Sequence, residues 1–274
     1  MKVTCLVDNA SLRGSRLWAE HGLSFLIETD AGQILFDAGQ SGNVLSHNLA
    51  VMGITLANLD AIVLSHGHYD HTGGLREVLD RTRKVRLIAH PAVFEERFSR
   101  DGEKARSIGM PFSRNWLANM AHLELVTQPL EVLPSVWTTG EIYERPEPEG
   151  RSARHVIRDG EYWTPDPYRD DMALVLSTSI GLVVLCGCCH AGLLNSLEHV
   201  RRTFIGEVFA IVGGTHLETA DHAHLARVIH ILKELGSPRL YLNHCTGERA
   251  FVALSTAFGD AVLPCPAGTL LHFS

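Results

Sequence analysis

The sequence predicts an α/β protein built as a four-layer αβ/βα sandwich, with two mixed sheets flanked by helices. The first half opens with strand-like segments joined by a hairpin and continues as alternating strands and helices, and the second half repeats this order. The side chains best suited to chemistry directly follow apolar runs. These are the strand ends at which open α/β sheets place their binding sites.

The first half begins with antiparallel strands. We expect strands over residues 2–7, 24–29 and 33–36, and Asp30-Ala31-Gly32 is a turn sequence that joins the last two strands as a hairpin. A helix is expected around residues 44–52, a strand over 61–64, a helix from about 74 to 81, and a strand over 85–89.

The second half repeats the alternation, with strands expected over 173–177, 182–186, 208–212 and 239–242 and helices over 193–204, 222–235 and 248–258. Two segments interrupt the rhythm. Residues 95–115 are rich in arginine and broken by Gly109-Met110-Pro111, and residues 143–171 hold four of the eleven prolines. We expect both to be irregular surface insertions that act as lids or binding loops on a single domain covering residues 1–274.

Composition limits the class of protein. Hydrophobic residues at 45% and charged residues at 20% are typical of a soluble globular chain, and a net charge of −7 without a basic face argues against nucleic acid as a partner. Because no signal peptide or stretch of transmembrane length is visible, we expect a cytoplasmic protein without membrane contact. The six cysteines are too few for a disulfide scaffold and are expected to be reduced. The oligomeric state is left open.

Four potential metal ligands occupy six residues in His66-Gly-His68-Tyr-Asp70-His71, directly after an apolar run and before a Gly-Gly helix start. Three imidazoles so close together are difficult to bury as uncharged core groups. Imidazole and carboxylate ligands suit zinc, iron or manganese. The segment therefore predicts a site for one or two divalent ions, with zinc favoured and manganese or iron also compatible.

This segment resembles the H-x-H-x-D-H signature of the metallo-β-lactamase superfamily, and Phe36-Asp37-Ala38-Gly39 is similar to the Asp-x-Gly strand end that precedes it there. Gly187-Cys188-Cys189-His190-Ala191-Gly192 and Leu242-Asn243-His244-Cys245-Thr246-Gly247 fall where that superfamily supplies its later histidine ligands. Within the superfamily, the chain looks most like the subgroup labelled 7,8-dihydropterin-6-methyl-4-(β-D-ribofuranosyl)aminobenzene-5′-phosphate synthase-like.

The resemblance implies the ligand set. His66, His68 and His190 would bind one metal ion, and Asp70, His71 and His244 would bind a second. Asp70 would also act in catalysis, by orienting the attacking water or accepting its proton. A second ion would stabilise the charge that grows on the leaving group.

The chain departs from the superfamily pattern at one position, because Gly187-Cys188 stands where relatives commonly carry Gly-Asp with a carboxylate that bridges both metals. Asp171 or the neighbouring Asp170 is a candidate replacement, and Cys188 is another. If none of these residues replaces the bridging carboxylate, the second metal site would be weak, so the number of ions stays open. We expect Asp37 to orient a ligand histidine from behind rather than to bind metal.

Several residues are candidates for substrate contact. His216 follows an apolar run and so lies at a strand end, and His21 stands in Glu20-His21-Gly22. For both, an ordinary structural role is an equal alternative. Arg97 and Arg106, in the arginine-rich insertion, could meet an anionic or phosphorylated small molecule, although a solvated face is the simpler interpretation.

The favoured function is a metal-dependent hydrolase that uses metal-activated water on an ester, lactone, amide or phosphoester. The subgroup label implies an alternative, a synthase or transferase acting on a pterin or a ribofuranosyl phosphate. A non-catalytic, metal-containing ligand sensor is a third hypothesis. A diiron oxidoreductase is disfavoured because no flavodoxin-like extension accompanies the chain.

Overall fold

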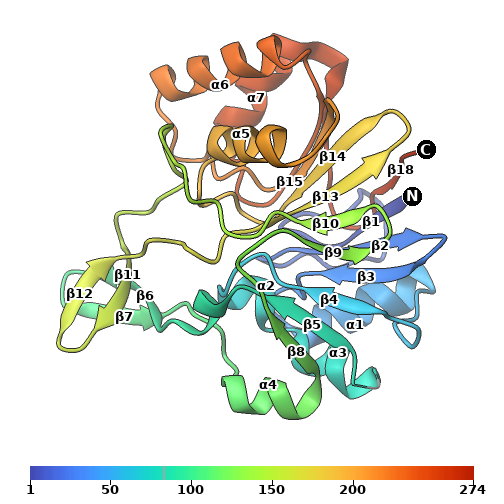
Figure 1. Ribbon diagram of the computed structural model, residues 1–274, viewed down its shortest axis with the longest axis vertical. Helices are drawn as coiled ribbons and strands as arrows, with labels where there is room; N and C mark the ends of the chain where they lie inside the picture. The colour runs from blue at the N-terminus through green and yellow to red at the C-terminus, as the bar shows by residue number, and fades with distance from the viewer. Residues whose placement is uncertain (83) are drawn as a thin grey trace.

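The computed structural model describes residues 1–82 and 84–274 of the chain. Two seven-stranded sheets pack face to face, and helices cover their outer faces (Figure 1). The first sheet has the order β18-β1-β2-β3-β4-β5-β8. Its strands are β1 (Lys2–Val7), β2 (Ser24–Thr29), β3 (Gly32–Phe36), β4 (Ala61–Val63), β5 (Arg86–Ala89), β8 (His122–Leu125) and β18 (Leu270–His272).

The second sheet has the order β17-β16-β15-β14-β13-β10-β9. Its strands are β9 (Leu130–Leu133), β10 (Val136–Thr138), β13 (Ala173–Thr178), β14 (Gly181–Cys186), β15 (Val208–Gly213), β16 (Arg239–Leu242) and β17 (Val262–Pro264). Each sheet is antiparallel at one side and parallel at the other, so the two halves of the chain share one architecture.

Helices α1 (Gly42–Met52), α3 (Leu75–Arg81) and α4 (Arg114–Met120) accompany the first sheet, and α5 (Leu193–Thr203), α6 (His222–Glu234) and α7 (Glu248–Phe258) cover the second (Figure 1). Short helices are α2 (Tyr69–Thr72), η1 (Pro91–Phe94) and η2 (Gly259–Ala261). Among the described residues, no helix has the length and apolar content needed to cross a membrane.

Three apolar layers hold the sandwich together. One lies between the two sheets and includes Phe25, Phe36 and Val212, all fully buried. The others lie between each sheet and its helices, around residues such as Leu45 and Val200. Burial of this apolar surface stabilises the arrangement by roughly 25 cal/mol per Å². The four-layer αβ/βα sandwich predicted from the sequence is confirmed.

The two predicted insertions are not irregular, as the sequence suggested. They pair with each other in a separate four-stranded sheet of order β12-β11-β6-β7, here called the accessory sheet. Its strands are β6 (Arg97–Asp101), β7 (Lys104–Ser107), β11 (His155–Asp159) and β12 (Tyr162–Pro165). Figure 1 shows the accessory sheet projecting from one side of the sandwich. Its central pairing joins segments more than fifty residues apart, which local sequence patterns do not reveal.

Candidate metal centre

Five strand ends deliver the polar residues of the centre. Asp37 follows β3, and the segment from Ser65 to His71 follows β4 and continues into α2. Cys188 and His190 follow β14, His216 follows β15, and His244 follows β16. These are carboxyl ends of strands, as the sequence predicted, because neighbouring parallel strands end at the same edge of a sheet. One detail differs: Asp70 and His71 lie in the first turn of a short helix instead of a loop.

Close packing of the two halves depends on glycine. A Cβ atom at Gly187 would stand 2.1 Å from Ser65 Oγ and 3.2 Å from Asp37 Oδ2. A larger residue at that position would push the Cys188–His190 segment away from the first half of the chain. Gly187 therefore lets ligand-bearing loops from the two sheets approach each other.

The first group consists of His66, His68 and His190. His66 Nε2 lies 3.0 Å from His68 Nδ1, and the three residues offer ligand atoms within 4.8 Å of one another. All three are buried. His190 Nε2 has no hydrogen-bond partner among the described residues, although it is buried. An unpartnered lone pair beside two other imidazole nitrogens fits the demand of a metal ion for neutral donors.

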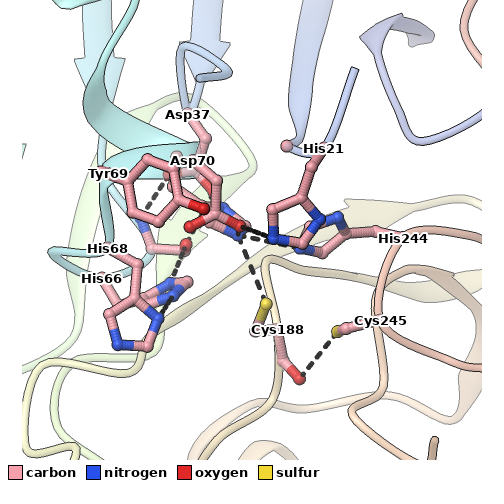
Figure 2. Close-up of polar contacts among 12 residues, drawn as sticks. His21, Asp37, His66, His68, Tyr69, Asp70, Cys188, His244 and Cys245 are labelled. Atoms are coloured by element: carbon pink, nitrogen blue, oxygen red, sulfur yellow. Dashed lines mark hydrogen bonds and ion pairs between the residues drawn. The ribbon is translucent and has the colours of Figure 1, made fainter. Parts of the chain in front are cut away.

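The second group consists of Asp70, His71 and His244. His71 Nε2 lies 3.2 Å from His244 Nε2, and Asp70 Oδ2 lies 3.6 Å and 3.5 Å from these two nitrogens. Such separations suit donors that share one ion at bond lengths of about 2.0–2.2 Å. Figure 2 shows Asp70 and His244 meeting beside His21. The six residues assigned to metal by resemblance therefore come together in two adjacent groups.

Hydrogen bonds fix the orientation of four of these imidazoles. The Nδ1–H of His71 donates to Asp37 Oδ2 at 2.7 Å, and the Nδ1–H of His190 donates to the Gly150 carbonyl at 2.8 Å. His244 Nδ1 lies 3.0 Å from Asn9 Oδ1, which can only accept. Each of these rings therefore carries its proton on Nδ1 and turns a bare Nε2 toward the centre.

The fourth imidazole is held through a relay. Ser65 Oγ donates to Asp37 Oδ2 at 2.6 Å, so it accepts the Nδ1–H of His66 at 2.8 Å. The backbone N–H of Ser65 also donates to Asp37, at 2.7 Å. Asp37 thus orients His71 directly and His66 through Ser65. The sequence predicted an orienting role for Asp37 but did not single out Ser65 or Asn9.

Electrostatics favour the neutral, metal-ready form of most ligands. Burial lowers the pKa of His66, His68, His190 and His244 well below the usual value, and repulsion from neighbouring histidines adds to the effect. Burial opposes ionisation of Asp70 as well, but His71 and His244 hold the pKa of this carboxyl well below its usual range. Burial opposes the charged form of His71 too, but Asp37 and Asp70 raise the pKa of this ring. The centre therefore combines four imidazoles held neutral with His71 and one carboxylate.

Cys188 stands between the two groups. Its Sγ lies 3.3 Å from His71 Nε2, and it shares metal-binding geometry with His66 and His71 on one side and with His244 and Cys245 on the other. Figure 2 shows the Cys188 sulfur directed toward the histidines. Asp171 belongs to none of the four ligand groups found among the described residues. Its Oδ2 accepts the backbone N–H of Ala191 at 2.8 Å, and Asp170 similarly accepts that of Gly67 at 2.7 Å.

The residues expected to contact substrate lie in different environments. His21 Nε2 lies 3.2 Å from Asp70 Oδ2 with its side chain 55% exposed, so it stands at the mouth of the centre. The His216 ring lies 4.4 Å from that of His190, and its backbone is held at a left-handed φ of 47°. Arg106 is exposed and stacks over Tyr69, with its Cζ atom 5.4 Å from the ring centroid.

Arg97 requires a correction. The sequence suggested a substrate-binding arginine, but the guanidinium is fully buried, with Nε 2.8 Å from Asp166 Oδ2 and Nη2 2.7 Å from Asp170 Oδ1. Its charge is neutralised within the protein, because a buried guanidinium without carboxylates would be very costly. Arg97 anchors the accessory sheet to the segment that binds Gly67.

Two residues of the centre escaped the sequence analysis. Tyr168 stacks on His190 with ring centroids 4.2 Å apart and planes at 6°, and His155 lies 5.3 Å from His68. Burial, followed by repulsion from His216, lowers the pKa of His155 to about 4. Both residues come from the second insertion. Their positions depend on the accessory sheet, so no local motif marked them.

A cleft of about 850 Å³ borders the second group. His21, Asn9 and His244 line it together with apolar residues that include Phe251 and Val252. A cavity of this size is typical of small-molecule sites, which combine apolar walls with a few polar groups. The cleft thus reaches the second group at His21 and His244.

The comparisons with known proteins agree with this geometry. The family model described as the metallo-beta-lactamase superfamily matches residues 17–188. The 7,8-dihydropterin-6-methyl-4-(beta-D-ribofuranosyl)-aminobenzene-5′-phosphate synthase of Methanocaldococcus jannaschii is 28% identical, over all of this chain and 97% of its own length. Protein MJ0448 of the same organism is 31% identical, over 92% of this chain and 93% of its own.

Solved structures lead to the same family. The crystal structure of Tm1679, a metal-dependent hydrolase of the beta-lactamase superfamily, superimposes with a TM-score of 0.86 at 28% identity and covers all of this chain and 99% of its own. The superfamily and subgroup suggested by the sequence are thereby confirmed. The chain belongs to the metallo-β-lactamase superfamily.

Proposed function

We propose that the protein is a metal-dependent hydrolase of small esters, lactones, amides or phosphoesters. The observation that carries the proposal is the set of four imidazoles with protonated, hydrogen-bonded Nδ1 atoms and bare Nε2 atoms directed at one another. Burying lone pairs without a partner costs free energy, so a set of buried bare nitrogens indicates that something binds them. The donor set fits divalent zinc, manganese or iron(II).

The residues that would hold the ions follow from the two groups. His66, His68 and His190 would bind one ion, and Asp70, His71 and His244 would bind a second, with Cys188 as a further candidate ligand. When bound, the ions would supply Lewis acidity, which lowers the pKa of a water molecule and polarises the substrate oxygen. Asp37, Ser65 and Asn9 would keep the imidazoles oriented for this task.

Proton transfer would involve Asp70 and His21. As water adds to the electrophilic carbon or phosphorus of the substrate, one water proton passes to the Asp70 carboxylate, whose low pKa keeps it ionised at neutral pH. His21 Nε2, 3.2 Å away and open to the cleft, can take this proton onward. The bond to the leaving group then breaks, and the leaving atom, an oxygen or in an amide a nitrogen, takes up the proton from His21 or from solvent.

The test is an assay panel of phosphodiesters, phosphomonoesters, lactones and thioesters with metal-loaded protein. We expect turnover of at least one class, and its loss when His68→Ala removes metal and when Asp70→Asn removes the proton acceptor. Metal content is measured in parallel, because Asp70→Asn also removes a ligand of the second ion, whereas His68→Ala removes a ligand of the first. Full turnover by chelator-stripped protein would contradict the proposal, and ligand binding without any turnover would indicate a sensor.

A second candidate function rests on one comparison. The full-length relative from M. jannaschii is a synthase by name, so a bond-forming reaction on a pterin or ribofuranosyl phosphate is the alternative. Isotopically labelled water separates the two, because only hydrolysis places the label in the product. Labelled product from the substrate found in the panel would support the hydrolase.

A further inference from the structure

The accessory sheet places three hydrogen-bond donors in one row. Arg106 on β7 lies directly opposite Ser99 on β6, and Ser99 lies directly opposite His155 on β11. Residues directly opposite each other in antiparallel strands carry their side chains on the same face of the sheet. A guanidinium, a hydroxyl and an imidazole, contributed by both insertions, therefore share one face.

This face is turned toward the metal centre. The His155 ring lies 5.3 Å from that of His68, and Arg106 Nη1 lies 3.4 Å from the hydroxyl of Tyr69, the residue before Asp70. The opposite face has a different character. There Phe98 packs edge-on against Trp163 at 5.0 Å, and Arg100 stacks over the same ring at 5.1 Å.

The Tyr168 hydroxyl lies within hydrogen-bond distance of the His155 ring. Tyr168 Oη accepts the backbone N–H of Ser152 at 3.4 Å and lies 3.0 Å from His155 Nδ1, to which it can donate its own proton. An imidazole that accepts at Nδ1 carries its proton on Nε2. In this arrangement, with Tyr168 donating to Nδ1, His155 presents an N–H donor from the inner face of the accessory sheet.

Arg106 carries a charge that the protein does not neutralise. Among residues 1–82 and 84–274, no carboxylate lies within ion-pair distance of Arg106, whereas Arg97 on the neighbouring strand has both Asp166 and Asp170. An exposed guanidinium held over an aromatic ring is well suited to an oxyanion.

We propose that the row formed by Arg106, Ser99 and His155 binds a phosphate group of the substrate, while the bond to be broken lies over the metal centre. The inference rests on the proposed function for its reaction but stands on the geometry of the sheet for its binding site. A phosphate monoester carries up to two charges and three free oxygens, which match three donors better than the two oxygens of a carboxylate do.

The test compares the affinity of metal-loaded protein for D-ribose 5-phosphate and for D-ribose, measured by titration calorimetry. We expect the phosphate to improve the Kd on the order of tenfold or more, as charge-assisted hydrogen bonds typically do. Arg106→Gln and His155→Phe should each remove most of that difference. His155→Gln, which keeps an N–H donor, should retain more of it than His155→Phe.

The matched control is Arg100→Gln, which removes an arginine from the other face of the same sheet and should preserve the difference. The proposal is overturned if wild-type protein binds both sugars equally, or if Arg106→Gln and His155→Phe bind the phosphate as tightly as wild type, since the metal centre alone would then bind it. If Arg100→Gln weakens binding of the phosphate equally, binding would depend on the overall positive charge of the accessory sheet and not on the proposed row. Because the measurement needs no turnover, it is independent of whether wild-type protein hydrolyses a neutral ester, which tests the proposed function.

Discussion

At the scale of single residues, the metal centre depends on the hydrogen-bond partners of the ligand histidines as much as on the ligands themselves. Ser65 serves two partners at once, since it accepts from His66 and donates to Asp37. The outer contacts decide which nitrogen of each ring faces the centre, and such contacts typically change metal affinity by about 10–100-fold. This makes residues that never touch metal testable parts of the site.

Ser65→Ala should weaken zinc binding by about 10–100-fold while leaving the fold intact, because His66 loses the acceptor that fixes its tautomer. Competition with a chromogenic chelator measures the Kd. Ser107→Ala, at an exposed position of the accessory sheet, is the control. An unchanged Kd for Ser65→Ala would show that the relay has no influence on the centre.

Cys188 is expected to act as a thiolate ligand when the second ion is present. In cobalt-substituted protein, the wild type should show sulfur-to-cobalt charge-transfer absorption, and Cys188→Ser should lose it together with part of the metal content. Cys5→Ala, which alters a buried cysteine of β1, should keep the absorption. A spectrum that survives in Cys188→Ser would assign the sulfur ligand to another cysteine.

Asp171 gives a pH-dependent prediction. Burial raises the pKa of its carboxyl from the ordinary value of 3.8 to about 6, so the folded state disfavours the ionised form. The stability contributed by the protonated carboxyl is full below about pH 4 and is lost as the pH rises through about 6. In metal-free protein, Asp171→Asn should therefore gain stability relative to wild type between pH 4 and pH 6. A difference in Tm that stays constant across that range would refute this assignment.

At the scale of elements, the accessory sheet is tied to the metal-binding segment by buried polar contacts. Arg97 on β6 holds Asp170, and Asp170 accepts the N–H of Gly67 between His66 and His68. The accessory sheet therefore has a structural role at the centre. It helps to set the conformation of the loop that carries two ligands.

Arg97→Leu should lower the free energy of unfolding by about 3–5 kcal/mol, because it leaves Asp166 and Asp170 buried without their counter-charge. Urea denaturation measures the loss. Arg100→Leu, on the outer face of the same strand, removes a cation–π contact and an exposed hydrogen bond to the Gly102 carbonyl, and should cost about 1 kcal/mol. Similar losses for both variants would mean that the buried ion pairs have no special importance.

The elements also show what could be predicted from the sequence. Strands and helices of the sandwich follow apolar periodicity, so β2, β14 and α7 begin and end close to the predicted residues. The accessory sheet could not be predicted, because its polar strands pair across long sequence separations. For the same reason, His155 was missed and Arg97 was misread. Burial and pairing, not residue type, separate the roles of Arg97 and Arg106.

At the scale of the whole molecule, the centre joins the two halves of the sandwich. The ligands in the segment from His66 to His71 come from the first sheet, whereas His190 and His244 come from the second. Bound ions would therefore cross-link the halves, and anything that binds only the folded state adds to its stability. The resemblance to the superfamily named the six candidate ligands, but their convergence is a property of the complete fold.

The most direct test of this account is anomalous X-ray diffraction from crystals of zinc-loaded protein, recorded at the zinc absorption edge. We expect a peak about 2.0–2.1 Å from nitrogen atoms of His66, His68 and His190, with a second peak between Asp70, His71 and His244. Absence of any peak among these residues in fully loaded crystals, or zinc bound only elsewhere on the protein, would contradict the central claim.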